Sequence, residues 1–150
     1  MRCKKNFNLP VSLAMRAAIE QLKQKPISFG SSIETRQYLR LQLEQLEREV
    51  FVVLFLDNQH RLIANETTSL GTINATSVYP REIVKAVLSH NAAAVILAHN
   101  HPSGLAEPRN ADRLVTERLK DALSLIDVRI LDHVVVGQGE SMSFAEQGWL

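Results

Sequence analysis

The fold of this chain is decided by one stretch, in which Ala93-Ala94-Val95-Ile96-Leu97-Ala98 is followed by His99-Asn100-His101-Pro102-Ser103-Gly104. A short apolar run between polar residues is typical of a buried strand. Side chains two positions apart in an extended segment point the same way, about 7 Å apart along the strand. His99 and His101 can therefore converge on one point while Asn100 faces elsewhere. Pro102 and Gly104 then end the strand and begin a turn.

A carboxylate follows at Asp112, in the first turn of a helix that the pattern predicts from Ala111 onward. From there it can fold back towards the two histidines. Two neutral imidazoles and one carboxylate form a zinc-binding set of the kind that leaves the fourth position to water. The competing interpretation is a pair of buried structural histidines. Burial tendencies favour that interpretation for a lone histidine, and less so for two histidines on one strand face.

The composition is that of an ordinary globular protein, since 45% of the 150 residues are hydrophobic and 22% are charged. This length most simply forms one domain with a sizeable core. The net charge of +1 gives no basic footprint for nucleic-acid binding. The single cysteine, Cys3, excludes a disulfide framework and a thiolate zinc cluster. It also excludes a zinc nucleobase deaminase, whose site needs more than one cysteine.

Neither a membrane span nor a secretory signal is predicted. No apolar run approaches the ~18 residues of a transmembrane helix. The basic residues Arg2, Lys4 and Lys5 are not followed by the apolar segment of a signal peptide. We therefore expect a cytoplasmic protein.

Residues 1–30 are predicted to form an N-terminal helical extension. An apolar stripe recurs at helical spacing after Pro10 and comprises Val11, Met15, Ala18, Ile19 and Leu22. This stripe fits a helix docked on the core. It also fits a helix that binds a partner or pairs two copies of the chain in a homodimer.

Residues 31–150 are predicted to form one α+β domain, a central mixed sheet flanked by helices. The run Val50–Leu56 is entirely apolar and predicts a central strand covered on both faces. The other predicted strands span residues 61–65, 69–73, 128–136 and 141–144. The other predicted helices span 31–46, 110–126 and a segment that begins at Pro80. The predicted buried faces of these helices comprise Leu39, Leu43 and Leu46; Ile83, Val84, Val87 and Leu88; and Val115, Leu119, Ala122 and Ile126.

Several blocks of this sequence resemble one protein family. The pattern His99-x-His101-Pro102 with Asp112 resembles the metal motif of the JAMM (MPN) metalloproteases. The blocks Tyr79-Pro80-Arg81-Glu82, His99 to Gly104, Leu131-Asp132-His133 and Ser143-Phe144-Ala145-Glu146 look like its RadC-type branch. The resemblance covers about residues 30–150 and implies the JAMM/MPN architecture, which is cytidine-deaminase-like. It also implies Zn²⁺ as the cofactor, with His99, His101 and Asp112 as ligands.

The same resemblance implies a general base. In JAMM enzymes the base is a glutamate near the start of an upstream strand, a place that Glu49 matches. Glu66, at the end of the second hairpin strand, is the alternative base, and Glu49 also fits a charged residue that only flanks its strand. The requirement that the base sit within one water of the metal favours Glu49. His133 lies in a matching block and fits a structural role or a position behind the metal ligands. Ser103 fits either a hydroxyl near the site or a turn-stabilising residue.

Arg109 departs from the family pattern, which has a serine eight residues after the second histidine. In the family that serine is taken to help hold the substrate carbonyl or the metal-bound water. An arginine at this position could stabilise an oxyanion by its charge, or it could abolish turnover.

The leading hypothesis is therefore a zinc-dependent metalloprotease or isopeptidase that hydrolyses an amide bond of a peptide or protein substrate. The alternative is a non-catalytic zinc module that binds a protein or nucleic acid, in line with the traditional association of the RadC name with DNA repair or mobile elements. A metal-free structural domain is the third interpretation. Full-length relatives carry an N-terminal helix-hairpin-helix region, for which the first 30 residues are too short.

Overall fold

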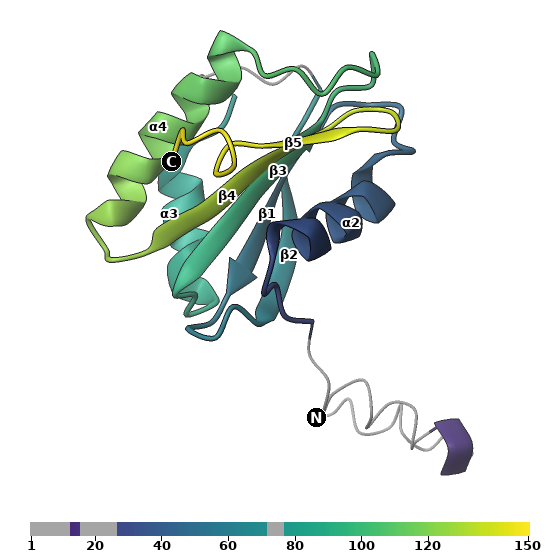
Figure 1. Ribbon diagram of the computed structural model, residues 1–150. Helices are drawn as coiled ribbons and strands as arrows, with labels where there is room; N and C mark the ends of the chain where they lie inside the picture. The colour runs from purple at the N-terminus through teal and green to yellow at the C-terminus, as the bar shows by residue number, and fades with distance from the viewer. Residues whose placement is uncertain (1–12, 16–26, 72–76) are drawn as a thin grey trace.

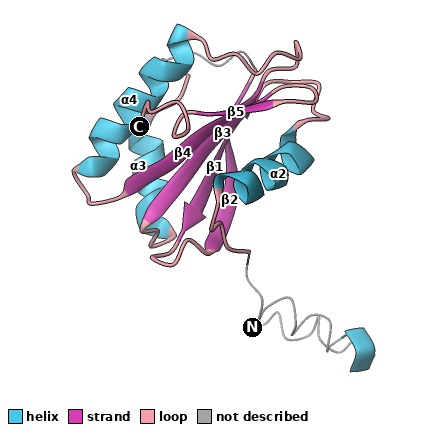
Figure 2. Cartoon of the chain, in the orientation of Figure 1, coloured by secondary structure: helices cyan, strands magenta, loops and turns pink. Residues whose placement is uncertain are grey.

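The computed structural model describes residues 13–15, 27–71 and 77–150, and it shows a five-stranded mixed sheet with helices on both faces. Helix α2 covers one face, and helices α3 and α4 cover the other (Figures 1 and 2). The predicted fold class is confirmed. The elements, in chain order, are α2 (Ser32–Leu43), β1 (Val50–Leu56), β2 (Leu62–Leu70), α3 (Pro80–Ser89), β3 (Ala94–Asn100), α4 (Asn110–Ser124), β4 (Arg129–Val136) and β5 (Ser141–Ser143).

The two central strands carry the core. All seven residues of β1 and all seven of β3 are buried, as expected for central strands covered on both faces. Alternate side chains of β1 serve opposite faces. Phe51, Val53 and Phe55 pack with α3 and α4, whereas Val52 and Leu54 pack with α2. Each face of the sheet thus has its own apolar cluster.

The strand order is β2-β1-β3-β4-β5. Strand β3 runs antiparallel to β1, with Phe51 opposite His99, and parallel to β4, with Val135 opposite His99. The start of β1 and the ends of β3 and β4 therefore lie together at the same end of the sheet. Because Glu49 directly precedes β1, this topology brings it to the end of the sheet where the two histidines lie.

Three helix predictions need correction. Helix α2 ends at Leu43, and Leu46 lies in the following turn with 41% of its surface exposed, so it is not part of the buried face. In α4 the third buried apolar position is Leu123, which continues the spacing of Val115 and Leu119, and the helix ends at Ser124. In α3 the predicted face is also narrower, because Leu88 is exposed.

Strand β2 is one nine-residue strand, whereas the sequence predicted two short ones. It lies at the edge of the sheet, and its residues alternate between half-buried and exposed. Its middle part, Asn65-Glu66-Thr67-Thr68, lacks the apolar run by which buried strands are recognised. An edge strand needs only one partner, and β1 supplies it over the whole length from Leu62 to Leu70.

The predicted N-terminal helical extension falls largely outside the described residues. Of that segment, residues 13–15 are described and are helical, whereas residues 27–30 are described and are not helical. Ser28 forms a bridge with Arg61, and Phe29 is buried in the core of the domain. The division at residue 30 therefore stays a prediction. Within the described ranges, no helix has the length and apolar character needed to cross a bilayer.

Candidate metal centre

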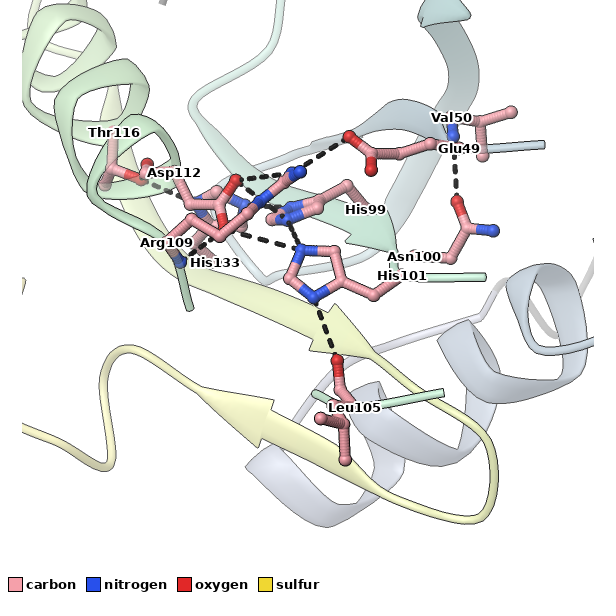
Figure 3. Close-up of polar contacts among 10 residues, drawn as sticks. All are labelled: Glu49, Val50, His99, Asn100, His101, Leu105, Arg109, Asp112, Thr116 and His133. Atoms are coloured by element: carbon pink, nitrogen blue, oxygen red, sulfur yellow. Dashed lines mark hydrogen bonds and ion pairs between the residues drawn. The ribbon is translucent and has the colours of Figure 1, made fainter. Parts of the chain in front are cut away.

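His99 and His101 converge at the end of β3, as predicted. His99 is completely buried on the face that carries Phe51, with which its ring is stacked. His101 directly follows β3, and its backbone N–H donates a hydrogen bond to the carbonyl of Val136 at the end of β4. The two Nε2 atoms lie 3.0 Å apart (Figure 3). The backbone geometry of a single strand end thus aims both imidazoles at one point.

Asp112 completes the group from the first turn of α4. Its Oδ2 atom accepts a 2.7 Å hydrogen bond from the backbone N–H of Arg109, the residue that precedes the helix. This bond caps the helix and turns the carboxylate towards the sheet. Oδ1 lies 3.1 Å from Nε2 of His99, and Oδ2 lies 3.4 Å from Nε2 of His101. One ligand atom from each of the three buried residues lies within 4.8 Å of the others.

These three residues fit a metal ion chemically. Nδ1 of His101 lies 2.9 Å from the carbonyl oxygen of Leu105, which can only accept a hydrogen bond. Nδ1 of His101 must therefore carry the proton. In the neutral ring, Nε2 is then a bare acceptor that faces the acceptor atoms of Asp112. Such a buried set of acceptors calls for a cation between them, and nitrogen with carboxylate oxygen is a donor set that zinc prefers.

The environment also favours the protonation states that bind metal. Burial by itself would raise the pKa of Asp112. The imidazoles of His101 and His99 and the guanidinium of Arg109 outweigh burial and hold this pKa well below its usual range. Burial lowers the pKa of His99, although Asp112 opposes this shift, and burial lowers the pKa of His133 further. At neutral pH the site therefore presents a carboxylate and a neutral His99.

We predict that the metal-free protein loses stability as the pH falls below about 6.5, the ordinary histidine value. The unfolded chain then takes up protons on His99 and His133 that the folded chain, with its lowered pKa values, does not bind. Each histidine adds a slope of at most about 1.4 kcal/mol per pH unit. Urea unfolding with a chelator present, at several pH values from about 7.5 down to about 5.5, measures how the free energy of unfolding changes with pH. His133→Phe should show a shallower slope, and a flat profile would contradict the prediction.

The loop after His101 is held against the end of β4 by a close backbone approach. Gly104 donates to the carbonyl of His101, and Gln138 donates to the carbonyl of Gly104. A Cβ atom at Gly137 would lie 2.4 Å from the oxygen of Gly104 and 2.8 Å from the amide nitrogen of Ala106. Only glycine permits this contact. The loop in turn places the Leu105 carbonyl that orients the ring of His101.

Gly137→Ala is expected to lower the free energy of unfolding by about 1–3 kcal/mol, because the added methyl group must push the loop away from β4. The matched control is Gly30→Ala, since a Cβ there meets nothing closer than Glu34 Oε2 at 3.8 Å. Chemical denaturation of the two variants and the wild type measures the difference. Equal stability of all three proteins would show that the loop shifts without cost.

Ser103 lies exposed in the turn after Pro102. Within the described part of the chain, its side chain makes no hydrogen bond to His99, His101 or Asp112. The turn-stabilising interpretation and the substrate-contact interpretation both stay predictions.

Arg109 links the predicted base to the metal-ligand set. Its Nη2 atom lies 2.9 Å from Oε2 of Glu49 and 3.0 Å from Oδ1 of Asp112 (Figure 3). The side chain of Glu49 is 12% exposed and that of Arg109 is 38% exposed. Burial would lower the pKa of Arg109, but the two carboxylates raise it, so the guanidinium stays charged. The structure thus places Glu49, Arg109 and Asp112 in one connected group.

Glu66 belongs to a different surface. It lies on β2 opposite Val53, and its carboxylate contacts the ring of His90. Val53 is in turn opposite Leu97, two residues before His99 on β3. Glu66 is therefore separated from the histidine cluster by the width of strand β1 and by two residues along β3. Of the two candidate bases, Glu49 is the one joined to the cluster.

Asn100 holds the segment that carries Glu49. Its buried side chain accepts a 2.8 Å hydrogen bond from the N–H of Val50 and donates a 2.9 Å hydrogen bond to the carbonyl of Arg48. In Figure 3 the amide points away from the two histidines that flank it. The alternation of side chains along the strand predicts that Asn100 faces away from the point where the histidines converge, but it predicts no role for Asn100. The signal available in the sequence was a polar residue within a strand predicted to be buried, because such a side chain needs hydrogen-bond partners.

Comparisons with known proteins agree with the family that the sequence resembles. A family model described as RadC-like JAB domain matches residues 29–149. A protein of Leptothrix cholodnii named UPF0758 is 60% identical over 140 residues, which are 93% of this chain and 63% of that protein. A UPF0758 protein of Vibrio cholerae is 56% identical over 140 residues, 93% of this chain and 62% of its own length. This chain therefore spans less than two thirds of these two relatives.

Proposed function

Because this chain belongs to the RadC-like JAB domain family, we propose that it is a zinc-dependent hydrolase that cleaves a peptide or isopeptide bond. The observation that carries the proposal is the buried group of His99, His101 and Asp112, with Glu49 joined to it through Arg109. The substrate is a peptide or protein. The net charge of +1 does not favour a nucleic acid as the partner.

His99, His101 and Asp112 would hold the metal as two neutral imidazoles and one carboxylate. When bound, a zinc ion supplies Lewis acidity, which acidifies water and polarises a carbonyl oxygen. Three protein donors are the number that catalytic zinc sites use, so this set would suit a metal that also takes part in the reaction. The buried walls, formed by Phe51 and the β4 strand, keep the surroundings apolar and strengthen charge interactions within the site.

Glu49 would act as the general base, which takes a proton from the attacking water and returns it to the leaving amine. Asn100 fixes the backbone on both sides of Glu49 and so positions its carboxylate. Arg109 would stabilise the negative charge that develops on the carbonyl oxygen of the substrate. To do so, its guanidinium would release part of its contact with Glu49 when the substrate enters.

A second candidate function rests on that contact. Because Arg109 occupies the carboxylate of Glu49 at 2.9 Å, it competes with any water for the same oxygen. In this alternative, the chain is a non-catalytic zinc module that binds a protein partner, and Arg109 is the residue that prevents turnover. The two functions make opposite predictions for the removal of the guanidinium.

The test is hydrolysis of a panel of peptides and lysine-linked isopeptides by the zinc-loaded chain and by its Arg109→Ser variant. Arg81→Ser, at an exposed position of α3, is the matched control. Cleavage by the wild type that is lost with chelator supports the hydrolase, and slower cleavage by Arg109→Ser supports the oxyanion role. Cleavage by Arg109→Ser alone supports the non-catalytic module. Zinc-loaded proteins that all leave the panel intact would contradict the hydrolase.

A further inference from the structure

A buried line of hydrogen bonds leads from the metal centre into the protein. Nδ1 of His99 lies 2.8 Å from Nε2 of His133, which is on β4. Nδ1 of His133 lies 2.5 Å from the hydroxyl of Thr116 on α4. That hydroxyl donates a 2.9 Å hydrogen bond to the backbone carbonyl of Asp112, one helical turn earlier. The line begins at one metal-ligand residue and ends on the backbone of another (Figure 3).

The hydrogen-bond capacities of these groups give the line a direction. A threonine hydroxyl has one proton, and here it is donated to the carbonyl of Asp112. The hydroxyl oxygen must then accept from Nδ1–H of His133. Within the described ranges no carboxylate hydrogen-bonds the ring of His133, which is completely buried, so a doubly protonated ring there would be an uncompensated charge. Nε2 of His133 is therefore bare, and Nδ1–H of His99 donates to it.

This direction decides which nitrogen of His99 is free. With its proton on Nδ1, His99 presents a bare Nε2 to Asp112 Oδ1 at 3.1 Å and to His101 Nε2 at 3.0 Å. If the line ran the other way, the proton of His99 would lie on Nε2. A divalent metal ion could not bind His99 there until that proton moved.

The ring of His133 is held in place by packing on both sides. Phe144 stacks on it with ring centres 4.5 Å apart, and the edge contact with Phe51 has centres 5.7 Å apart. Thr116 is buried as well. A ring so enclosed cannot turn to exchange its two nitrogens without disturbing the core. The acceptor for His99 is therefore fixed before any ligand arrives.

We infer that His133 and Thr116 are positioning residues for the metal centre, which set the tautomer of His99 so that its Nε2 atom is presented without a proton. This inference rests on the metal site of the proposed function. Groups behind a metal-binding histidine typically change metal affinity by about 10–100-fold. Here the group behind the ligand is a second histidine, and its own tautomer is fixed by a threonine hydroxyl.

The test compares zinc affinity, measured by competition with a chromophoric chelator, for the wild type, His133→Phe, Thr116→Val and Thr116→Ser. We expect affinity to fall about 10–100-fold in His133→Phe and Thr116→Val, and Thr116→Ser to stay within about threefold of the wild type. Thr67→Val, at an exposed position of β2, is the matched control. Circular dichroism of each variant shows whether it is folded. Thr116→Val is close in shape to threonine, so it tests the hydroxyl even if His133→Phe does not fold.

A second readout is the tautomer itself. Nitrogen-15 NMR of histidine-labelled, zinc-loaded wild type should show His133 protonated at Nδ1, and Thr116→Val should change the nitrogen shifts of His133. A proton on Nε2 of His133, or unchanged zinc affinity in folded Thr116→Val, would overturn the inference. The proposed hydrolase is judged separately, because loss of zinc affinity in the variants supports the positioning role of His133 and Thr116 even if the wild type cleaves no peptide. A wild type that binds no zinc overturns both.

Discussion

Replacing His101 or Asp112 by alanine is expected to abolish stoichiometric zinc binding. The wild type should carry about one zinc ion per chain, held by three protein donors. Either replacement removes one of the three and leaves the remaining buried donors with an incomplete set. Elemental analysis after dialysis, with each protein expressed in zinc-supplied cells, measures the content. We expect the two variants to retain a small fraction of the wild-type zinc.

The control for this experiment is Asp121→Ala, which removes an exposed carboxylate from the same helix as Asp112. It should keep the wild-type zinc content. Because Asp112 also caps α4, Asp112→Asn is the second variant, since its amide oxygen can still accept from the N–H of Arg109. A wild type without zinc, or alanine variants with full zinc content, would contradict the assignment of this site.

Glu49→Gln is expected to remove turnover while leaving zinc in place. General acid–base groups typically contribute about 10²–10⁴-fold to rate, and glutamine cannot take up a proton at neutral pH. Glutamine has the same shape as glutamate and can still accept a hydrogen bond from Nη2 of Arg109. The site should therefore keep its geometry. Initial rates on whichever substrate the peptide panel yields, together with zinc content, measure the separation.

Glu66→Gln is the matched control for the base, because Glu66 is the other glutamate that the sequence offers as a base. Glu66 lies on β2 and contacts His90, the residue that directly follows α3. We expect the rate of Glu66→Gln to stay within about threefold of the wild-type rate, because a residue that transfers no proton in the reaction should contribute little to it. Equal rates for Glu49→Gln and the wild type would transfer the role of base to another group. A large loss in Glu66→Gln would point to this second surface.

Much of the fold could be predicted because its central strands carry strong local signals. The seven apolar residues of β1 and the apolar run of β3 are buried on both faces, so each strand can be predicted from its own apolar residues without knowing which strands pair with it. Strand β2 was harder, since it lies at the sheet edge and is half exposed along its whole length. The predicted end of α2 was also wrong. Leu46 continues the helical spacing of Leu39 and Leu43, but the helix ends at Leu43 and Leu46 is exposed.

The candidate site divides in the same way. The convergence of His99 and His101 follows from the spacing of two residues on one strand, and the position of Asp112 follows from a helix start. The contacts of Arg109 with Glu49 and Asp112 join residues 60 positions apart, at 2.9 Å, and three positions apart, at 3.0 Å. Thr116 and His133 meet across α4 and β4. Such contacts depend on the register of the sheet and on how a helix docks, which spacing along the chain does not encode.

The placement of the three donor atoms on a strand end and on a helix start has a thermodynamic consequence. A ligand that binds only the folded chain adds its binding free energy to stability, by about 2.7 kcal/mol at a free concentration one hundred times its dissociation constant. In a chain of this length, that corresponds to a rise in Tm of roughly 5–11 °C. Zinc would join the sheet to α4 as a cross-link that only the native topology can form. The amount of this protein that survives heat or proteolysis should therefore follow the free zinc concentration of its surroundings.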